Sequence, residues 1–279
     1  MRLAIEHLSR YHYRSVVSSS YNEARMTPMN SGGQFVLSSS VNTQPYSSVF
    51  EYVDYFGTVV SAFDIHESHR TLEVKATSLV ETSKRNIEVA EVTWEYLESD
   101  EVASPLCEYL GSSYYINEDE LIREISRDLR SKNTPVEFVY AVASYIQSNL
   151  LYQPGSTSVT TPAIDALVGK AGVCQDFAHL MISLCRSAGV PTRYVSGYLY
   201  PVLEAKVGER SSGESHAWVE VFLGRWHPID PTNSLAVDSH HVVLGRGRDY
   251  SDIRPLHGIY QGGDLESLEI EVSFTLMSL

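Results

Sequence analysis

The chain has 279 residues, enough for one or two domains, and 43% of them are hydrophobic, which supports a packed globular core. Acidic residues outnumber Lys and Arg by 35 to 21, and a net charge of −14 would repel nucleic-acid phosphates and anionic lipid headgroups. We therefore expect neither nucleic acid nor a membrane surface as a partner.

The cysteine content and the hydropathy pattern bear on where the protein works. No stretch approaches the roughly 20 apolar residues of a membrane span, and the first fifteen residues lack a continuous apolar segment. Cys107, Cys174 and Cys185 have neither metal-type spacing nor the density of a disulfide framework. These features predict a soluble cytoplasmic protein with reduced thiols and no cofactor.

The first part of the chain shows the alternating pattern of β-strands. Runs such as "TLEVKATSLVE" and "NIEVAEVTW" alternate apolar and polar residues, and turn material such as "MNSGG" and "YFGT" separates the runs. An acidic stretch without Lys or Arg follows, between Arg85 and Arg123, and we interpret it mainly as a solvated face and linker. The pattern predicts an antiparallel β domain over residues 1–105 and a second domain over residues 106–279.

Helical periodicity begins after the acidic stretch. "ELIREISRDLR" and "TPVEFVYAVASYIQSNL" have the spacing of helices, the second with Thr134 as N-cap and Pro135 at its first position. "TPAIDALVGK" predicts a short helix after a loop. "CQDFAHLMISLCRSAGVP" then predicts a helix with one buried side that ends near Gly189.

Cys174 is placed at the predicted start of this last helix. Unpaired backbone N–H groups and the positive end of the helix dipole favour a thiolate there, and the thiolate is the reactive form of cysteine. Cys185 is eleven residues further along, on the apolar stripe, where a thiol serves as a small hydrophobe. We therefore treat Cys174 as the candidate nucleophile, and Cys185 and Cys107 as structural residues.

A hairpin later in the chain supplies a candidate base and a carboxylate to orient it. In "SHAWVEVFLGRWHPIDPTN", a short turn near Leu223 would pair residues whose numbers sum to about 446. His216 then lies opposite Asp230 to within one residue, on the same face and at the start of a strand. Cysteine, histidine and aspartate in this arrangement are typical of a catalytic triad.

The other histidines fit this role less well. His179 lies too far into the helix, and His227 alternates to the face opposite Asp230. His240 and His241 are expected in a loop.

Three stretches around these residues resemble the transglutaminase-like superfamily, and specifically its prokaryotic branch of cysteine protease-like proteins. They are "GVCQDFAHLMISLCRSAGVPTRYVSGYLYP", "SHAWVEVFLGRWHPIDPTN" and "GRGRDYSDIRPLHGIYQGG". The N-terminal stretches "SYNEARMTPMN", "QFVLSSSV" and "VDYFGTVVSAF" are similar to the β-rich domain that precedes the core in that branch. The resemblance implies an α+β fold with a papain-like core.

The resemblance also implies Cys174 as nucleophile, His216 as base and Asp230 as the orienting carboxylate. The chain departs from animal transglutaminases because V-C-Q stands in place of Q-C-W and no D-x-D-x-D-G calcium loop is present. Hydrolysis at an amide bond is therefore expected rather than calcium-dependent cross-linking. Peptides, proteins and small amides all remain possible substrates, and the oligomeric state is left open.

An acyl-transfer site also needs donors for the developing oxyanion. The backbone N–H of Cys174 is one candidate, and Gln175 or Tyr152 could supply the other, although an exposed or capping role suits Gln175 as well. We expect Asp176 to stabilise the helix N-terminus. Arg246 and Arg248 are expected in a loop, solvated or binding a substrate carboxylate.

Several residues near the hairpin have structural interpretations, and two other functions remain open. Trp218 and Trp226 are expected to pack as core or wall residues, and Asn233 to close the turn after the hairpin. A non-catalytic scaffold with the same fold is one alternative function. A zinc site at Cys174 and His216 is the other, but two ligands without a third make a poor site.

Overall fold

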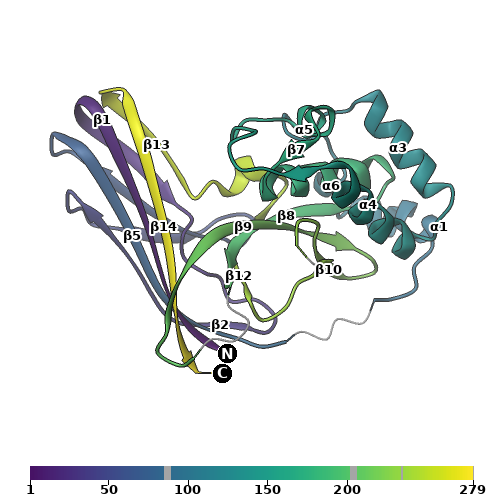
Figure 1. Ribbon diagram of the computed structural model, residues 1–279, viewed down its shortest axis with the longest axis horizontal. Helices are drawn as coiled ribbons and strands as arrows, with labels where there is room; N and C mark the ends of the chain where they lie inside the picture. The colour runs from purple at the N-terminus through teal and green to yellow at the C-terminus, as the bar shows by residue number, and fades with distance from the viewer. Residues whose placement is uncertain (85–88, 202–205, 234, 279) are drawn as a thin grey trace.

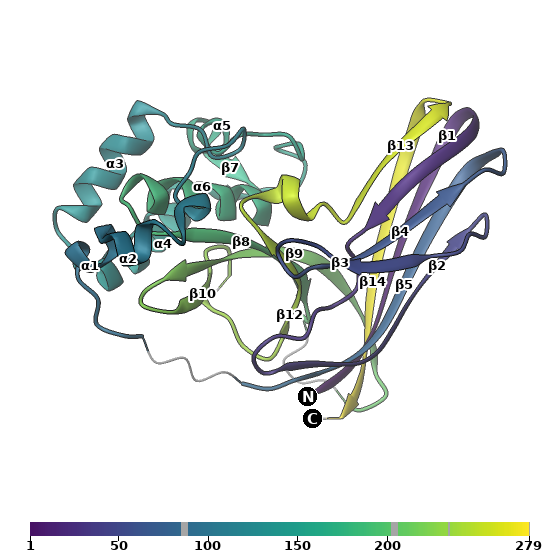
Figure 2. The same ribbon diagram turned by 180° about the vertical axis from the view of Figure 1, so that it is seen from behind.

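The computed structural model describes residues 1–84, 89–201, 206–233 and 235–278. Figure 1 shows two parts, with long strands gathered at one end of the molecule and the helices at the other, and Figure 2 shows the same division from behind. One twelve-stranded sheet runs through both parts, so the fold is α+β as expected.

The N-terminal part is a bent antiparallel sheet built around one very long strand. β1 (Arg2–Ala24) pairs with β14 and β5 along its first half and with β13 and β4 along its second half. β2 lies outside β5, and β3 lies outside β4. These strands are β2 (Gln34–Gln44), β3 (Phe50–Val53), β4 (Val59–Ile65), β5 (His69–Thr82), β13 (Leu256–Gly262) and β14 (Leu265–Ser278).

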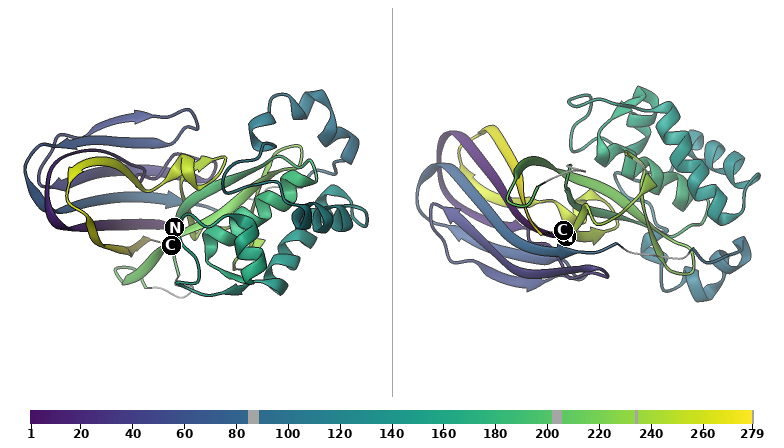
Figure 3. Two further views of the ribbon diagram at one scale, coloured as in Figure 1. Left: turned by 90° about the horizontal axis from the view of Figure 1, so that it is seen from above. Right: turned by 60° about the horizontal axis from the view of Figure 1, so that its bottom comes forward.

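The second part places helices against a smaller group of strands in the order β12, β8, β9, β10, β11. Figure 3 shows the helices grouped beside these strands and away from the N-terminal sheet. The longer elements are α3 (Glu120–Arg130), α4 (Pro135–Asn149), α5 (Ala163–Gly169), α6 (Cys174–Ser187), β8 (Thr192–Leu199), β9 (Arg210–Phe222), β10 (Trp226–Asp230) and β12 (His241–Gly247). The shorter ones are α1 (Trp94–Glu98), α2 (Asp100–Ala103), η1 (Cys107–Tyr109), β6 (Leu151–Tyr152), β7 (Ala171–Gly172), β11 (Leu235–Ala236) and η2 (Tyr250–Ile253).

Local sequence signals set the ends of the main helices. Thr134 caps α4, and its hydroxyl accepts from the backbone N–H of Glu137 while the Glu137 carboxylate accepts from the N–H of Thr134, a complete capping box. α6 ends before Gly189, whose φ of 83° is available to glycine at little cost. The helix boundaries expected from the sequence are confirmed within one or two residues.

The burial of α6 differs from the expectation. One buried side was predicted, but every residue from Gln175 to Arg186 is buried. The reason is that α6 lies between the strands β8 and β9 on one side and the helices α3, α4 and α5 on the other. A fully surrounded helix holds its first turn in a fixed position, which matters for the residue at its N-terminus.

Three sequence expectations are corrected by long-range pairing and local structure. The strand expected over residues 86–94 falls partly outside the described residues, residues 89–93 form no strand, and Trp94 begins α1. The strand expected to start at His216 begins earlier, because residues 210–215 are the first half of β9 and pair with β14 over 210–213. β13 and β14 follow the core in sequence but pair with β1 in the N-terminal sheet. They therefore belong with the expected domain of residues 1–105, although they lie in the range 106–279.

Among the described residues, the longest apolar helices fall short of what is needed to cross a membrane.

Candidate active site

Cys174 is the first residue of α6 and is partly exposed. The carboxylate of Asp176 accepts hydrogen bonds from the backbone N–H of Val173 at 2.8 Å and from the hydroxyl of Thr157 at 2.6 Å. A Cβ at position 172 would lie 2.6 Å from the Cβ of Asp176, so only glycine fits before this turn. Gly172 and Asp176 therefore fix the approach of the chain to the thiol, and Asp176 serves the helix N-terminus as expected.

The first turn of α6 also presents free backbone donors. Within the described part of the chain, the N–H groups of Cys174 and Gln175 donate to no acceptor. Such groups carry the positive end of the helix dipole, which favours an anion at this position. The thiol thus lies where both a thiolate and an oxyanion would be stabilised.

The hairpin of β9 and β10 brings His216 and Asp230 together, although the register differs from the prediction. Ile229 pairs with Val219, so paired residue numbers sum to 448 rather than about 446, and His216 lies diagonally across from Asp230. A shift of two residues keeps both side chains on the same face of the sheet. His216 lies in the middle of β9, not at its start. Its Nε2 lies 2.8 Å from Oδ2 of Asp230.

Asp230 is fully buried and accepts several hydrogen bonds. Its Oδ1 accepts the backbone N–H groups of Thr232 at 2.9 Å and Asn233 at 3.3 Å. Its Oδ2 accepts from His216 and from the side-chain amide of Asn233 at 3.0 Å. Burial opposes ionisation, but these hydrogen bonds and the nearby imidazoles hold the pKa of Asp230 well below its ordinary value. Asn233 closes the turn, as expected, and also contacts the candidate site.

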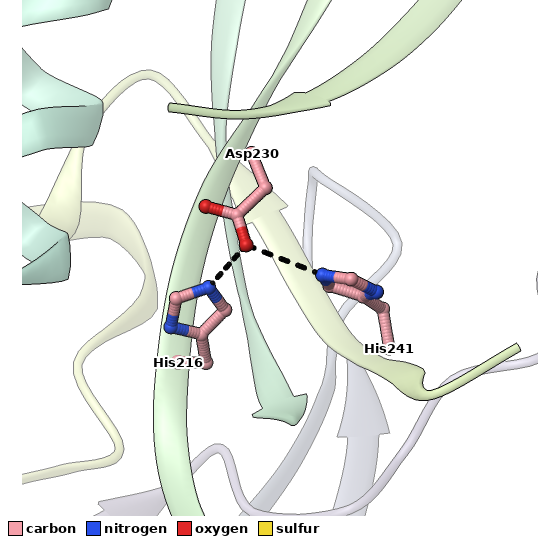
Figure 4. Close-up of side chains that lie close together, drawn as sticks. All are labelled: His216, Asp230 and His241. Atoms are coloured by element: carbon pink, nitrogen blue, oxygen red, sulfur yellow. Dashed lines mark hydrogen bonds and ion pairs between the residues drawn. The ribbon is translucent and has the colours of Figure 1, made fainter. Parts of the chain in front are cut away.

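A second histidine, His241, contacts the same carboxylate. It was expected in a loop, but it is the first residue of β12 and is buried. Its Nε2 lies 3.3 Å from Oδ2 of Asp230 (Figure 4), and its Nδ1 accepts the backbone N–H of Asp238 at 3.2 Å. The carboxylate oxygen Oδ1 of Asp238 also lies 3.4 Å from Nδ1, and with the backbone N–H of Asp238 donating to Nδ1 the proton is assigned to Nε2, which donates to Asp230.

The protonation of His216 reflects its two neighbours. Burial lowers the pKa of His216, but hydrogen bonds to Asp230 and Cys174, together with their charges, raise it to about 9. Because Asp230 occupies Nε2, Nδ1 is the ring nitrogen left for Cys174. A protonated imidazole that donates to the carboxylate of Asp230 is therefore favoured near neutral pH.

The remaining candidate residues lie in different surroundings. The side-chain amide of Gln175 donates to the backbone oxygen of Val159 at 3.0 Å, so this amide already has an internal partner. Tyr152 is exposed in β6, with its ring 6.2 Å from that of Phe177, and its pKa is raised by burial and then by the charges of Cys174 and Glu214, which keeps its hydroxyl a donor. The Tyr152 hydroxyl thus has no partner among the described residues, whereas the Gln175 side chain is bound to Val159.

The arginines near the glycine-rich stretch do not lie in one loop. Arg246 lies in β12 and is buried, and its guanidinium forms two hydrogen bonds with Glu220, at 2.8 and 2.9 Å. Arg248 bonds to Asp252. A substrate carboxylate at Arg246 would compete with Glu220, so that expectation is not supported.

The aromatic residues of the hairpin pack as expected. Trp218 is fully buried, with its ring 6.0 Å from that of His216 and 5.3 Å from that of His241. Trp226 packs against Tyr109 and Arg193. Trp218 thus forms a wall behind the two imidazoles.

One group of side chains could, by composition, hold a metal ion. Ligand atoms of His216, Asp230 and His241 lie within 4.8 Å of one another. Their separations of 2.8 and 3.3 Å are hydrogen-bond distances, and the cavity beside His241 and Trp218 measures only about 10 Å³. The hydrogen bonds account for this arrangement without an ion.

The sequence is similar to two family models. A model of the transglutaminase-like superfamily matches residues 123–231, a range that contains Cys174, His216 and Asp230. A model of the bacterial transglutaminase-like N-terminal region matches residues 3–81.

Similar proteins occur in bacteria and in humans. An uncharacterized protein of Mycobacterium leprae is 39% identical, and the match covers 99% of each chain. Kyphoscoliosis peptidase of Homo sapiens is 33% identical over 121 residues, which are 41% of this chain and 18% of that protein. A solved structure, described as a putative cysteine protease from Cytophaga hutchinsonii, has a similar fold, with a TM-score of 0.78, 24% identity, and coverage of 98% of this chain and 90% of that one.

Proposed function

The chain belongs to the transglutaminase-like superfamily, and from this membership and the geometry at the start of α6 we propose that it is a thiol enzyme acting on amide bonds. The observation that carries the proposal is the position of His216, whose Nε2 lies 2.8 Å from Asp230 and whose pKa is raised by Cys174 as well. Cys174 is the nucleophile, His216 the acid and base, and Asp230 the orienting carboxylate.

The proposed reaction passes through a thioester. The thiolate of Cys174 attacks the carbonyl carbon of an amide, and the C–N bond breaks as His216 gives its proton to the departing amine. A water molecule then attacks the thioester while His216 accepts a proton from it. The C–S bond breaks, the acyl group is released as a carboxylic acid, and the thiol of Cys174 is regenerated. An amine in place of water would give a transferred acyl group.

The negative charge that develops on the carbonyl oxygen needs hydrogen-bond donors that point at that oxygen. The free backbone N–H of Cys174 is the first proposed donor. The hydroxyl of Tyr152 is the better second candidate, because the side-chain amide of Gln175 is bound to Val159.

His241 and Asn233 support the orienting carboxylate. Each donates a side-chain hydrogen bond to Oδ2 of Asp230, at 3.3 and 3.0 Å. They are positioning residues, since they act on His216 through Asp230. Sequence reasoning assigned neither of them to the site, because their proximity depends on the pairing of β12 with β8 and on the turn after β10.

Hydrolysis is proposed over cross-linking because the chain lacks the features of the animal enzymes, and a peptide or protein is the proposed substrate class. Three free cysteines support a reducing, cytoplasmic location. We propose that the N-terminal β-rich domain guides substrate to the core rather than taking part in the chemistry.

A screen of a peptide library for both hydrolysis and amine incorporation tests the proposal. Wild-type protein should release product or incorporate the amine, and Cys174→Ala should do neither, with Cys185→Ala as a matched cysteine control. Product formation by Cys174→Ala, or none by wild type across the library, would favour the alternative of a non-catalytic scaffold.

A further inference from the structure

β9 and β14 join the two parts of the molecule over a short distance and then separate. They pair only over residues 210–213 of β9 and 272–275 of β14. Gly213 lies where they part, and a Cβ there would lie 2.0 Å from the ring of Phe274, so glycine allows the close contact. Figure 1 shows β14 leading away from β9 toward the far end of the N-terminal sheet.

Beyond this point β14 has an unpaired edge. Residues 265–271 pair with β1 on one side, and in the part of the chain that the structure describes no strand pairs with their other side. All seven residues are exposed. An edge strand of this kind presents backbone N–H and C=O groups to an incoming extended chain.

The open edge begins close to the candidate active site. His216 is three residues from Gly213 along β9, or roughly 10 Å at about 3.3 Å per residue, and Ile270 is two residues from Val272 along β14. The open edge and the candidate site are therefore joined by one short stretch of β9.

The side chains alternate in character over residues 268–271 of this edge. Leu268 and Ile270 are 42% and 52% exposed, on the face where Val272 and Phe274 are buried. Glu269 and Glu271 lie on the other face; Glu269 is paired with Arg10 at 2.8 Å, whereas Glu271 forms no ion pair among the described residues. The side chains of an added strand would lie beside those of β14. Apolar side chains of the added strand would contact Leu268 and Ile270, and basic ones would lie near the glutamates on the other face.

We propose that the outer edge of β14, residues 265–271, binds an extended polypeptide of alternating apolar and basic residues as an added strand and directs it to Cys174. The preferred substrate is then a basic polypeptide, and a small amide reaches Cys174 without help from this edge. The direction to Cys174 rests on the proposed function, whereas the binding at the edge does not.

Fluorescence anisotropy with a labelled seven-residue peptide of alternating valine and lysine tests the binding. The Cys174→Ala variant is used because it cannot cleave the peptide, and it should bind the peptide. Methylation of alternate backbone nitrogens of the peptide should weaken binding about tenfold or more, because strand addition needs those N–H groups. Equal affinity for the two peptides, or no binding of either, would overturn the proposal.

A pair of variants tests the location. Leu268→Arg should weaken binding of the peptide by about tenfold or more through charge repulsion and loss of apolar contact. Leu121→Arg is the matched control, because Leu121 is also 42% exposed but lies on α3, and it should bind as before. Equal losses in both variants, or no loss in Leu268→Arg, would contradict the assignment.

Measuring cleavage of two substrates distinguishes a failure of this inference from a failure of the proposed function. In the chain with Cys174 intact, Leu268→Arg should retain cleavage of a small chromogenic amide and lose cleavage of the peptide. Peptide binding without any turnover would overturn the proposed function and the direction to Cys174 while leaving the binding edge. Sedimentation velocity showing that the edge is covered by a second copy of the chain would overturn the binding proposal.

Discussion

The two ends of α6 carry the same functional group in opposite surroundings. Cys174 opens the helix, partly exposed, beside an imidazole and free backbone N–H groups. Cys185 is completely buried, and burial raises its pKa to about 12. Eleven residues of one helix thus separate a thiol that solvent and an imidazole can reach from one that is enclosed in the core.

The two thiols differ in their neighbours: Cys174 is near His216 on β9, whereas Cys185 lies among buried apolar residues of the core. A helix N-terminus alone favours a thiolate modestly, by roughly 0.3–1 kcal/mol. The proposed function therefore requires a further contribution from the pair of His216 and Asp230, and changes to this pair should make Cys174 behave as an ordinary thiol.

Removal of the imidazole should have the largest effect. His216→Ala is expected to slow alkylation of Cys174 by iodoacetamide near neutral pH by about 100-fold or more, because the thiolate loses its counter-charge. His227→Ala is the matched control on the same hairpin, since His227 bonds to Tyr140 instead. Peptide mass spectrometry after timed labelling measures both, and equal rates in the two variants would contradict the site geometry.

The same pair should make stability depend on pH. The pKa of His216 is raised from 6.5 to about 9, so its contribution to folding is present below about pH 6.5 and is lost as the pH rises through about 9. The contribution is at most about 3 kcal/mol. The difference in free energy of unfolding between wild type and His216→Ala, from urea titrations, should shrink between about pH 6 and pH 10; a difference that grows would contradict this assignment.

The orienting carboxylate should matter less than the imidazole. Asp230→Asn keeps the shape but removes the charge, and we expect alkylation of Cys174 to slow by about tenfold. Asp238→Asn, which changes a partly exposed carboxylate near the same turn, should change the rate much less. A rate for Asp230→Asn equal to that of wild type would show that His216 is held by other contacts.

His241 should have a smaller effect with a specific signature. His241→Phe removes one donor from Asp230, which leaves the carboxylate a stronger partner for His216. We expect the pKa of His216 in the pH profile to rise, and alkylation to slow by roughly twofold to fivefold because Asp230, and with it His216, is held less firmly in position. His241→Gln, which can donate again, should restore the profile, and an unchanged profile in His241→Phe would leave His241 with a structural role only.

The buried thiol should affect stability alone. Cys185→Ala removes one sulfur atom from a packed core and is expected to lower the free energy of unfolding by about 1 kcal/mol. Chemical denaturation measures the loss. The labelling rate of Cys174 should not change, and a change would mean that the two ends of α6 are coupled.

The elements that carry strong local signals could be predicted from the sequence. The capping box at Thr134, the start of α6 at Cys174 and the stop at Gly189 depend on nearby residues, and all three are found. The shared face of His216 and Asp230 was also predicted, since a register shift of two residues preserves the face.

The other features depend on contacts between distant parts of the chain. The pairing of β14 with β9 makes residues 210–213 a strand, although they contain serine and glycine and have no local strand signal. His241 reaches Asp230 because β12 pairs with β8, more than forty residues earlier. Its only sequence signal is its position at the start of the apolar run "HVVL", which indicates a strand end.

Competitive labelling of the three cysteines in the wild-type protein tests the central claim most directly. Brief treatment with iodoacetamide near pH 7, followed by peptide mass spectrometry, compares Cys174 with Cys107, which is exposed, and with Cys185, which is buried. The account predicts labelling of Cys174 about tenfold or more faster than Cys107 and almost none at Cys185. Labelling of Cys174 no faster than that of Cys107 would contradict an activated thiol at the start of α6.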